Sequence, residues 1–131
     1  VEQFESEGKT TMAVSHGGQF LGVLALADIP RPDVKETLQQ LLNLGVQKLV
    51  MLTGDNDDVA RQIAKEVGVT DVRAELLPED KLTTIKQLLE THGAVAMIGD
   101  GVNDAPALAT ATVGIAMGGA GTAVAHQLGY F

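Results

Sequence analysis

The spacing of the hydrophobic positions changes along this chain. Two apolar-rich segments, 11–15 and 19–27, flank His16-Gly17-Gly18 and predict two strands joined as a β-hairpin. The segment DIPRPD follows, and its two prolines cannot continue a strand ladder. We therefore expect a hinge between the hairpin and the rest of the chain.

Beyond the hinge, apolar residues recur three or four positions apart, which is the spacing of one face of a helix. Three helices are predicted: one over about 33–44 ended by Gly45, one capped by Asn56 and followed by Gly68, and one opened by Pro78. Their core-facing positions are Val34, Leu38, Leu41 and Leu42; Val59, Ile63 and Val67; and Leu82, Ile85, Leu88 and Leu89.

Short apolar runs alternate with these helices and predict strands. The runs are KLVML (48–52), DVRA (71–74), AVAMI (94–98) and TVGIA (112–116), with a short helix from Asn103 to about Thr110 before the last. Strands that alternate with amphipathic helices indicate an α/β fold with a parallel sheet covered on both faces. Ligands of such sheets bind in the loops after the carboxyl ends of the strands, so a site is expected there.

The composition fits one soluble globular domain. The chain has 131 residues, 45% hydrophobic and 20% charged, and it contains no Cys for a disulfide or a thiolate metal site. A formal net charge of −8 argues against a nucleic-acid or anionic membrane surface. No apolar run approaches the ~20 residues of a membrane span, and the acidic start does not resemble a signal peptide. Any spans of a membrane-bound parent would lie outside these residues.

Two of the expected loops carry groups that suit phosphate. Thr53-Gly54-Asp55-Asn56 follows a strand, and a Thr hydroxyl beside exposed backbone amides at a helix N-terminus favours phosphate oxygens. An ordinary strand-to-helix turn explains the same residues. In the segment 77–81, Lys81 places a cation in a first helical turn, where the helix dipole disfavours it, so it could be aimed at a bound anion. A solvated lysine is the alternative.

The third loop, GDGVNDAPAL (99–108), is the most specific. Asp100, Asn103 and Asp104 lie within five residues directly after an apolar strand. Neighbouring carboxylates repel each other unless a cation or hydrogen-bond donors compensate, and hard oxygen ligands beside phosphate indicate Mg²⁺. The alternative is a turn and helix cap, with Asn103 as the cap.

Read together, TGDN, PEDK and GDGVNDAPAL closely resemble the hinge-side half of the phosphorylation domain of P-type ATPases, membrane pumps built on the haloacid-dehalogenase fold. The resemblance covers about residues 10–125. The style of LALADIPRPDVKETLQQLLNLGV is most similar to the heavy-metal-transporting branch, and there to zinc, cadmium, lead or cobalt pumps more than to copper pumps.

The resemblance implies roles for four residues of the first two motifs. Thr53, with the Gly54 amide, would hold the phosphoryl group that is transferred from ATP. Asp55 would support the nucleotide or phosphoryl end, and Lys81 would neutralise the developing charge.

The third motif is implied to serve the metal. Asp100 would help to coordinate Mg²⁺, and Asp104 would support the same site while pairing with Lys81. Asn103 would hydrogen-bond phosphate or order the loop.

The chain also departs from the family pattern. The DKTGT segment with the nucleophilic Asp occurs nowhere in it, Ala123 stands where the family usually has Asp, and HQLGYF matches nothing expected. We therefore expect a Rossmann-like haloacid-dehalogenase fold that lacks the nucleophile strand. Residues 1–27 would be the last hairpin of the nucleotide-binding domain, 28–125 a partial phosphorylation domain, and 126–131 an irregular tail.

The expected function is that of part of the catalytic domain of an ATP-driven heavy-metal pump, on the cytoplasmic face of a membrane. Its partners would be ATP, the missing portions of the same pump and the transported cation, and the fragment alone would be inactive and prone to self-association. A soluble phosphatase of the same superfamily and a non-catalytic regulatory module are the alternatives.

Overall fold

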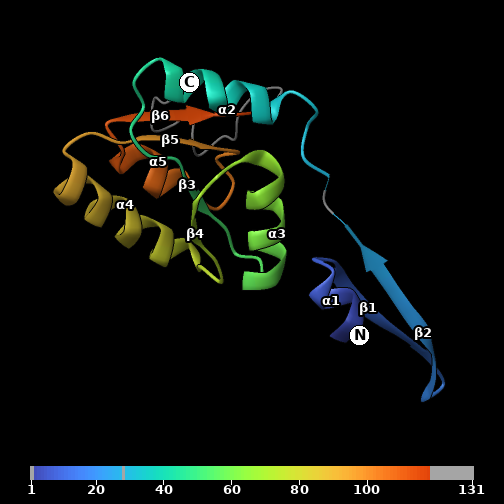
Figure 1. Cartoon of the computed structure of the whole chain (residues 1–131). Helices are drawn as coiled ribbons and strands as arrows, with labels where there is room; N and C mark the ends of the chain where they lie inside the picture. The colour runs from blue at the N-terminus through green and yellow to red at the C-terminus, as the bar shows by residue number, and fades with distance from the viewer. Residues whose placement is uncertain (1, 28, 119–131) are drawn as a thin grey trace. The chain divides into compact units, whose positions relative to one another are not determined.

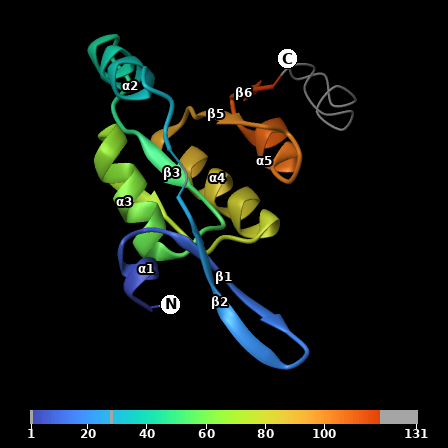
Figure 2. The same cartoon turned by 90° about the vertical axis from the view of Figure 1, so that its right-hand side faces the viewer.

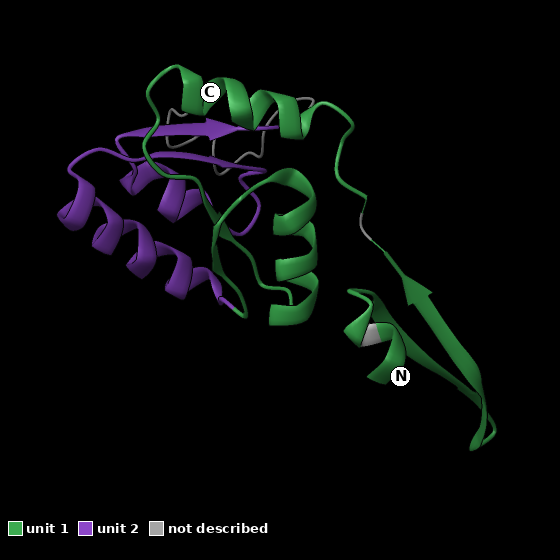
Figure 3. Ribbon diagram, in the orientation of Figure 1, with its two compact units in different colours: residues 1–75 green, residues 76–131 purple. Residues whose placement is uncertain are grey.

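The structure is a computed structural model that describes residues 2–27 and 29–118. The chain divides into two compact units, residues 1–75 and residues 76–131 (Figure 3). Within the described residues, no helix is both long and apolar enough to cross a bilayer. The predicted tail, 126–131, lies outside the described residues, and the predicted domain boundaries stay a prediction.

Unit 1 contains the hairpin, two long helices and one parallel strand pair (Figure 1). In chain order its elements are α1 (Glu2–Ser6), β1 (Thr10–His16), β2 (Gln19–Leu26), α2 (Val34–Asn43), β3 (Val50–Leu52), α3 (Asp57–Val67) and β4 (Asp71–Arg73). The antiparallel pairing of β1 with β2 confirms the predicted hairpin. The short helix α1 was not predicted, because its five residues carry no helical repeat of apolar positions.

The ends of α3 follow directly from its sequence. The Asn56 side chain accepts a hydrogen bond from the backbone N–H of Val59, as an N-cap does. Gly68 ends the helix in the left-handed region, with φ 84°, where a side chain would add strain. The face predicted to point inwards is buried at Val59 and Val67 and half-buried at Ile63.

Unit 2 packs two helices beside the second parallel pair, as Figure 2 shows from another side. Its elements are α4 (Pro78–His92), β5 (Ala96–Gly99), α5 (Ala105–Thr110) and β6 (Val113–Ala116). Helix α4 contacts α5, and α5 contacts both strands. Ile85 and Leu108, each less than 2% exposed, form the centre of this small core.

The described strands form three two-stranded sheets rather than one continuous sheet. Strands β3 and β4 are parallel, as are β5 and β6. The parallel pairing and the α/β class are as predicted, but the expectation of two covered faces is wrong for β5–β6. On one face of that pair Ile98 is 56% and Val113 52% exposed, while Met97 on the other face is buried.

Several boundaries differ from those predicted. Strand β3 is confined to three residues, and β5 begins at Ala96 instead of Ala94 and extends to Gly99. The N-cap of α5 is Asp104, so the alternative that made Asn103 the cap is wrong. Pattern alone places strand ends poorly, because the length of a ladder depends on the neighbouring strand.

Candidate functional site

The loop after β3 is closed by its own side chains. The Thr53 hydroxyl donates a hydrogen bond to Asp55 Oδ2 (2.9 Å), and the Asp55 backbone N–H donates one to Thr53 Oγ1 (3.1 Å). Both side chains are half-buried, and Gly54 between them is exposed. The hydroxyl therefore lies at the carboxyl end of the strand, with an accessible glycine backbone beside it.

Two backbone hydrogen bonds join this loop to the end of β4. Thr53 N–H donates to the Arg73 carbonyl (3.0 Å), and Glu75 N–H donates to the Asp55 carbonyl (2.8 Å). Glu75 has a φ of 56°, in the left-handed region that non-glycine residues seldom adopt. The sequence pattern does not point to Arg73 or Glu75, because both act through main-chain atoms that every residue carries.

The loop after β5 is organised around one buried carboxylate. Asp104 is 6% exposed, and its Oδ1 accepts a hydrogen bond from the Gly101 backbone N–H (2.9 Å). The Asp104 backbone carbonyl accepts a hydrogen bond of 2.8 Å from the Leu108 N–H, and this bond belongs to the first turn of α5. Asp104 therefore holds the loop and the helix start together.

The positions on either side of Asp100 both require glycine, each for a different structural reason. A Cβ on Gly99 would lie 2.2 Å from Asp104 Oδ2, so any side chain there would displace the carboxylate. Gly101 is buried and has a φ of 78°, which a side chain would strain. The Asp104 carboxylate thus requires the first glycine of GDG, and the left-handed backbone requires the second.

Asp100 and Asn103 point into solvent from the same loop. Both are exposed, and Asp100 Oδ1 accepts a hydrogen bond from the Val102 backbone N–H (2.9 Å). Within residues 2–27 and 29–118 the second oxygen of Asp100 has no protein donor, so one hard anionic ligand is available. Mg²⁺ in proteins is commonly held by one or two carboxylates together with waters and phosphate oxygens, so this donor set fits it.

The described residues contain no ready cluster of three or more acidic or histidine side chains able to hold a metal ion. The assignment of Asp100 and Asp104 as metal ligands stays a prediction.

Lys81 lies in the first turn of α4. Asp80 accepts a hydrogen bond from the Leu77 backbone N–H through Oδ2 (2.9 Å), which caps the helix, and Pro78 opens it. Within the described ranges the half-buried Lys81 ammonium makes no ion pair. Its implied pairing with Asp104 is not present in the structure and stays a prediction.

The structure thus brings together two groups of predicted residues. Thr53, Gly54 and Asp55 form one hydrogen-bonded loop of unit 1. Asp100, Asn103 and Asp104 share one loop of unit 2. Lys81 lies in α4 of the same unit, and no hydrogen bond or ion pair among the described residues joins it to that loop.

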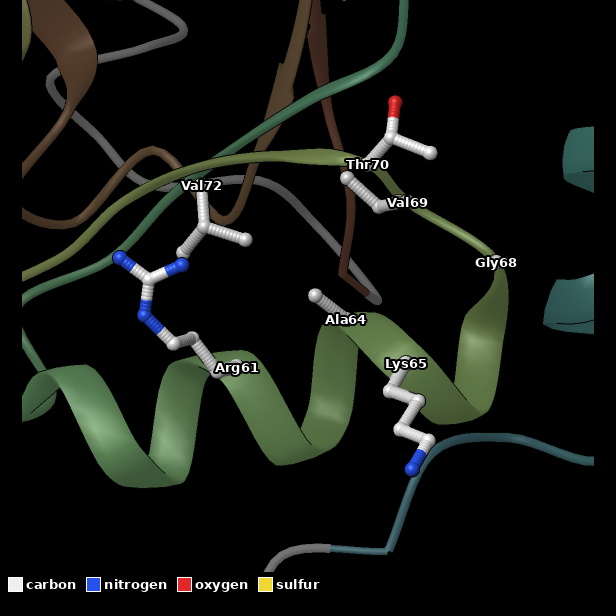
Figure 4. A pocket seen from close by; sticks show the side chains of 7 residues that line it. All are labelled: Arg61, Ala64, Lys65, Gly68, Val69, Thr70 and Val72. Atoms are coloured by element: carbon white, nitrogen blue, oxygen red, sulfur yellow. The ribbon is translucent and has the colours of Figure 1, made fainter.

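A separate pocket of about 380 Å³ lies in unit 1 and includes none of these residues. Figure 4 shows its lining from the second half of α3 and the segment up to β4. The Arg61 side chain reaches towards Val72, and the Lys65 side chain points away from Val72. Arg61 is paired with Asp57 on its own helix, so the two cations do not form one anion site.

Comparison with known proteins shows which family the chain belongs to. The family model described as haloacid dehalogenase-like hydrolase matches residues 1–112. The probable cadmium-transporting ATPase of Alkalihalophilus pseudofirmus is 55% identical over 127 residues, which make up 97% of this chain and 18% of that protein.

Two further comparisons extend this likeness. The copper-exporting P-type ATPase of Staphylococcus haemolyticus is 50% identical over 127 residues, 97% of this chain and 16% of that protein. A solved structure of a zinc-transporting PIB-type ATPase in its E2.Pi state is 44% identical with a TM-score of 0.76, and the match covers 97% of this chain and 20% of that one. The chain therefore spans a fifth or less of the length of these proteins.

Proposed function

Because the chain belongs to the haloacid dehalogenase-like hydrolases and matches heavy-metal P-type ATPases over nearly its whole length, we propose that it serves phosphoryl transfer in an ATP-driven heavy-metal pump. The aspartate that receives the phosphoryl group lies outside this chain. The parent protein would hold this segment at the cytoplasmic face of its membrane.

The observation that carries the proposal is the loop at 99–104. A buried Asp104 fixes the loop backbone, and an exposed Asp100 stands at the carboxyl end of β5, with one carboxylate oxygen that no described residue contacts as a donor. In α/β sheets this end of the strands is where ligands bind. An ordinary turn requires neither the buried carboxylate nor the two constrained glycines around Asp100.

The charge and the position of each residue in the 99–104 loop suit it to a different role. Asp100 would hold Mg²⁺, whose bound charge neutralises phosphate oxygens, and Asp104 would keep Asp100 in place through the loop. Asn103, exposed on the same loop, would hydrogen-bond phosphate. Phosphoryl transfer depends on such positioning and charge stabilisation more than on covalent chemistry by side chains.

The Thr53 hydroxyl would hold the transferred phosphoryl group together with the Gly54 amide. In this structure the Thr53 hydroxyl donates its hydrogen bond to Asp55. When the phosphoryl group binds, a phosphate oxygen would replace Asp55 as the acceptor. Asp55 would then release the hydroxyl and support the nucleotide end.

Lys81 carries the sharpest test, because its ammonium is the cation proposed to face the transferred group. In the full-length protein, Lys81→Ala should slow phosphoenzyme formation from radiolabelled ATP and Mg²⁺ by about 30- to 1000-fold, the equivalent of ~2–4 kcal/mol of lost charge stabilisation. Asp104→Asn should impair the Mg²⁺ dependence of the same step.

Lys86→Ala is the matched control, because Lys86 is exposed on the same helix and has no assigned role. It should form phosphoenzyme at the wild-type rate. Wild-type rates in both Lys81→Ala and Asp104→Asn would refute the proposed site.

The cation preference belongs to the same proposal. We expect the ATPase activity of the full-length protein to be stimulated more by Zn²⁺, Cd²⁺ or Pb²⁺ than by Cu⁺. A metal panel in which copper alone activates would reverse the choice of branch.

A further inference from the structure

The loop after β3 is held at both of its ends by the backbone around the end of β4. At the start of the loop the Thr53 N–H donates a hydrogen bond to the Arg73 carbonyl (3.0 Å), and at its end the Asp55 carbonyl accepts one from the Glu75 N–H (2.8 Å). Between these bonds the Gly54 N–H has no acceptor within the described part of the chain. Both bonds lie within unit 1, whose last residue is Glu75 (Figure 3). The loop is therefore fixed at its ends and accessible in its middle.

The bond from Glu75 differs from the one that a continued strand ladder would make. Strands β3 and β4 are parallel, and the bond from Thr53 to Arg73 extends their register by one step. The next step of a regular parallel ladder would join the Glu75 N–H to the Thr53 carbonyl. The Glu75 N–H instead donates to the Asp55 carbonyl, two residues further along the chain. The ladder thus stops at Thr53, and the bond from Glu75 closes the loop that follows.

The backbone of Glu75, and not its side chain, explains this contact. The side chain is exposed and makes no hydrogen bond or ion pair within the described residues. Of the described non-glycine residues, Glu75 is the one at positive φ, with a value of 56°. The left-handed conformation costs free energy for an L-residue, so it persists only where the surrounding structure holds it in place.

We propose that Glu75 is a positioning residue for phosphoryl transfer, which keeps the Thr53 hydroxyl and the Gly54 amide in place through its backbone N–H. This role rests on the proposed function, in which these two groups hold the transferred phosphoryl group. The left-handed turn lets the chain leave β4 while the Glu75 N–H stays bonded to the loop. Groups that hold a reacting phosphoryl group depend on such fixed placement, because a displacement of about 1 Å can cost up to ~100-fold in rate.

Amide hydrogen exchange of the 131-residue chain, measured by NMR, tests the contact without any activity. Relative to an unstructured chain, the Glu75 amide should be protected at least about tenfold more than the Gly54 amide. Glu75→Gly keeps the N–H and accepts the left-handed backbone, so the protection at position 75 should remain. Glu75→Val keeps the N–H but disfavours that backbone, so exchange at position 75 should accelerate about fivefold or more.

Glu36→Val is the matched control, because Glu36 is exposed in helix α2 of the same unit, where the backbone is right-handed. It should change the exchange rate at Glu75 by less than about twofold. Unchanged exchange in Glu75→Val would overturn the proposal. Equal protection of the Glu75 and Gly54 amides in the wild type would do the same, and this comparison needs no variant, so it decides even if Glu75→Val does not fold.

Phosphoenzyme formation by the full-length protein tests the role in the reaction. From radiolabelled ATP and Mg²⁺, Glu75→Val should form phosphoenzyme about tenfold more slowly, whereas Glu75→Gly should stay within about twofold of the wild type. In a Thr53→Ala background the slowing by Glu75→Val should shrink to less than about threefold, because the contact acts largely through Thr53. Slowing by the same factor in both backgrounds would contradict the proposal, since a general loss of folding produces that result.

The same measurements separate this proposal from the proposed function. A wild-type rate in Glu75→Val together with a slow Thr53→Ala would refute the role of Glu75 and leave the role of Thr53 intact. A wild-type rate in Thr53→Ala would refute the role of Thr53 in the proposed function, and the role of Glu75 would fall with it.

Discussion

Asp104 shows how one side chain determines the sequence around it. Its carboxylate is buried, accepts a hydrogen bond from Gly101 and lies so close to Gly99 that no side chain fits there. Gly99 is therefore a consequence of Asp104 and Gly101 of its left-handed backbone, whereas Asp100 between them stays exposed and available to a ligand. Thr53 and Asp55 form a comparable pair after β3, bound to each other.

Gly99→Ala should destabilise unit 2. The added Cβ would lie 2.2 Å from Asp104 Oδ2, so the buried carboxylate must move and its bond to Gly101 weakens. We expect a loss of about 1–3 kcal/mol in the free energy of unfolding, the usual range for overpacking a buried site. Urea unfolding followed by circular dichroism measures it.

Gly22→Ala is the control for this change, since a Cβ on Gly22 meets nothing within 4 Å. Its free energy of unfolding should differ from the wild type by less than about 0.5 kcal/mol. Equal stability of Gly99→Ala and the wild type would show that the contact with Asp104 is not tight.

At the scale of elements, the short parallel pairs depend on contacts beyond their few ladder bonds. Strands β3 and β4 share only three residue pairs. The Lys48 ammonium, just before β3, lies 2.8 Å from Asp71 Oδ2 at the start of β4, and Arg73 contributes a longer contact of 3.8 Å. The hydrogen bond from Lys48 holds the pKa of Asp71 below its ordinary value, with the charge of Arg73 acting in the same direction.

This pair makes the stability of unit 1 depend on pH. Because the pKa of Asp71 is lower in the folded chain than in the unfolded one, its contribution is present above the unfolded value of about 3.9 and is lost as pH falls through the folded value. Lys48→Gln should therefore cost about 0.2–1 kcal/mol at neutral pH, and this difference should vanish in acid. Urea unfolding at a series of pH values measures both.

Lys35→Gln provides the comparison, because Lys35 is exposed on α2 and makes no ion pair within residues 2–27 and 29–118. Its effect on the free energy of unfolding should not change over the pH range in which Asp71 titrates. A Lys48→Gln effect that persists unchanged in strong acid would mean that Asp71 is not its partner.

For the whole molecule, the missing DKTGT segment decides what the chain can do alone. We expect no acid-stable label when the 131-residue chain is incubated with radiolabelled ATP and Mg²⁺. Asp104 is buried and bound to Gly101, and Asp100 is proposed as a metal ligand, so neither is placed as a nucleophile.

The full-length protein, treated in the same way, is the positive control. Stoichiometric label that maps to any aspartate of this chain would contradict the assignment and require a new nucleophile.

The sequence pattern was sufficient to predict those features that depend only on residues close by in the chain. Asn56 and Gly68 bound α3 as predicted, Pro78 opens α4, and the residues around His16-Gly17-Gly18 form the hairpin turn. Caps and turns are satisfied within a few residues, so their signals can be read directly from the chain. Two of the motif segments, TGDN and GDGVNDAPAL, were located because each follows an evident apolar run, and PEDK was located by the proline that opens its helix.

Only the tertiary structure decided how side chains are used. It showed that Asp104 turns back to Gly101 and that Asp104, not Asn103, begins α5. It showed that the strands form separate pairs and that the larger apolar side chains of the hairpin lie exposed. These features depend on which distant groups come within a few ångströms, and on the surface that they leave open, and neither property is local to the sequence.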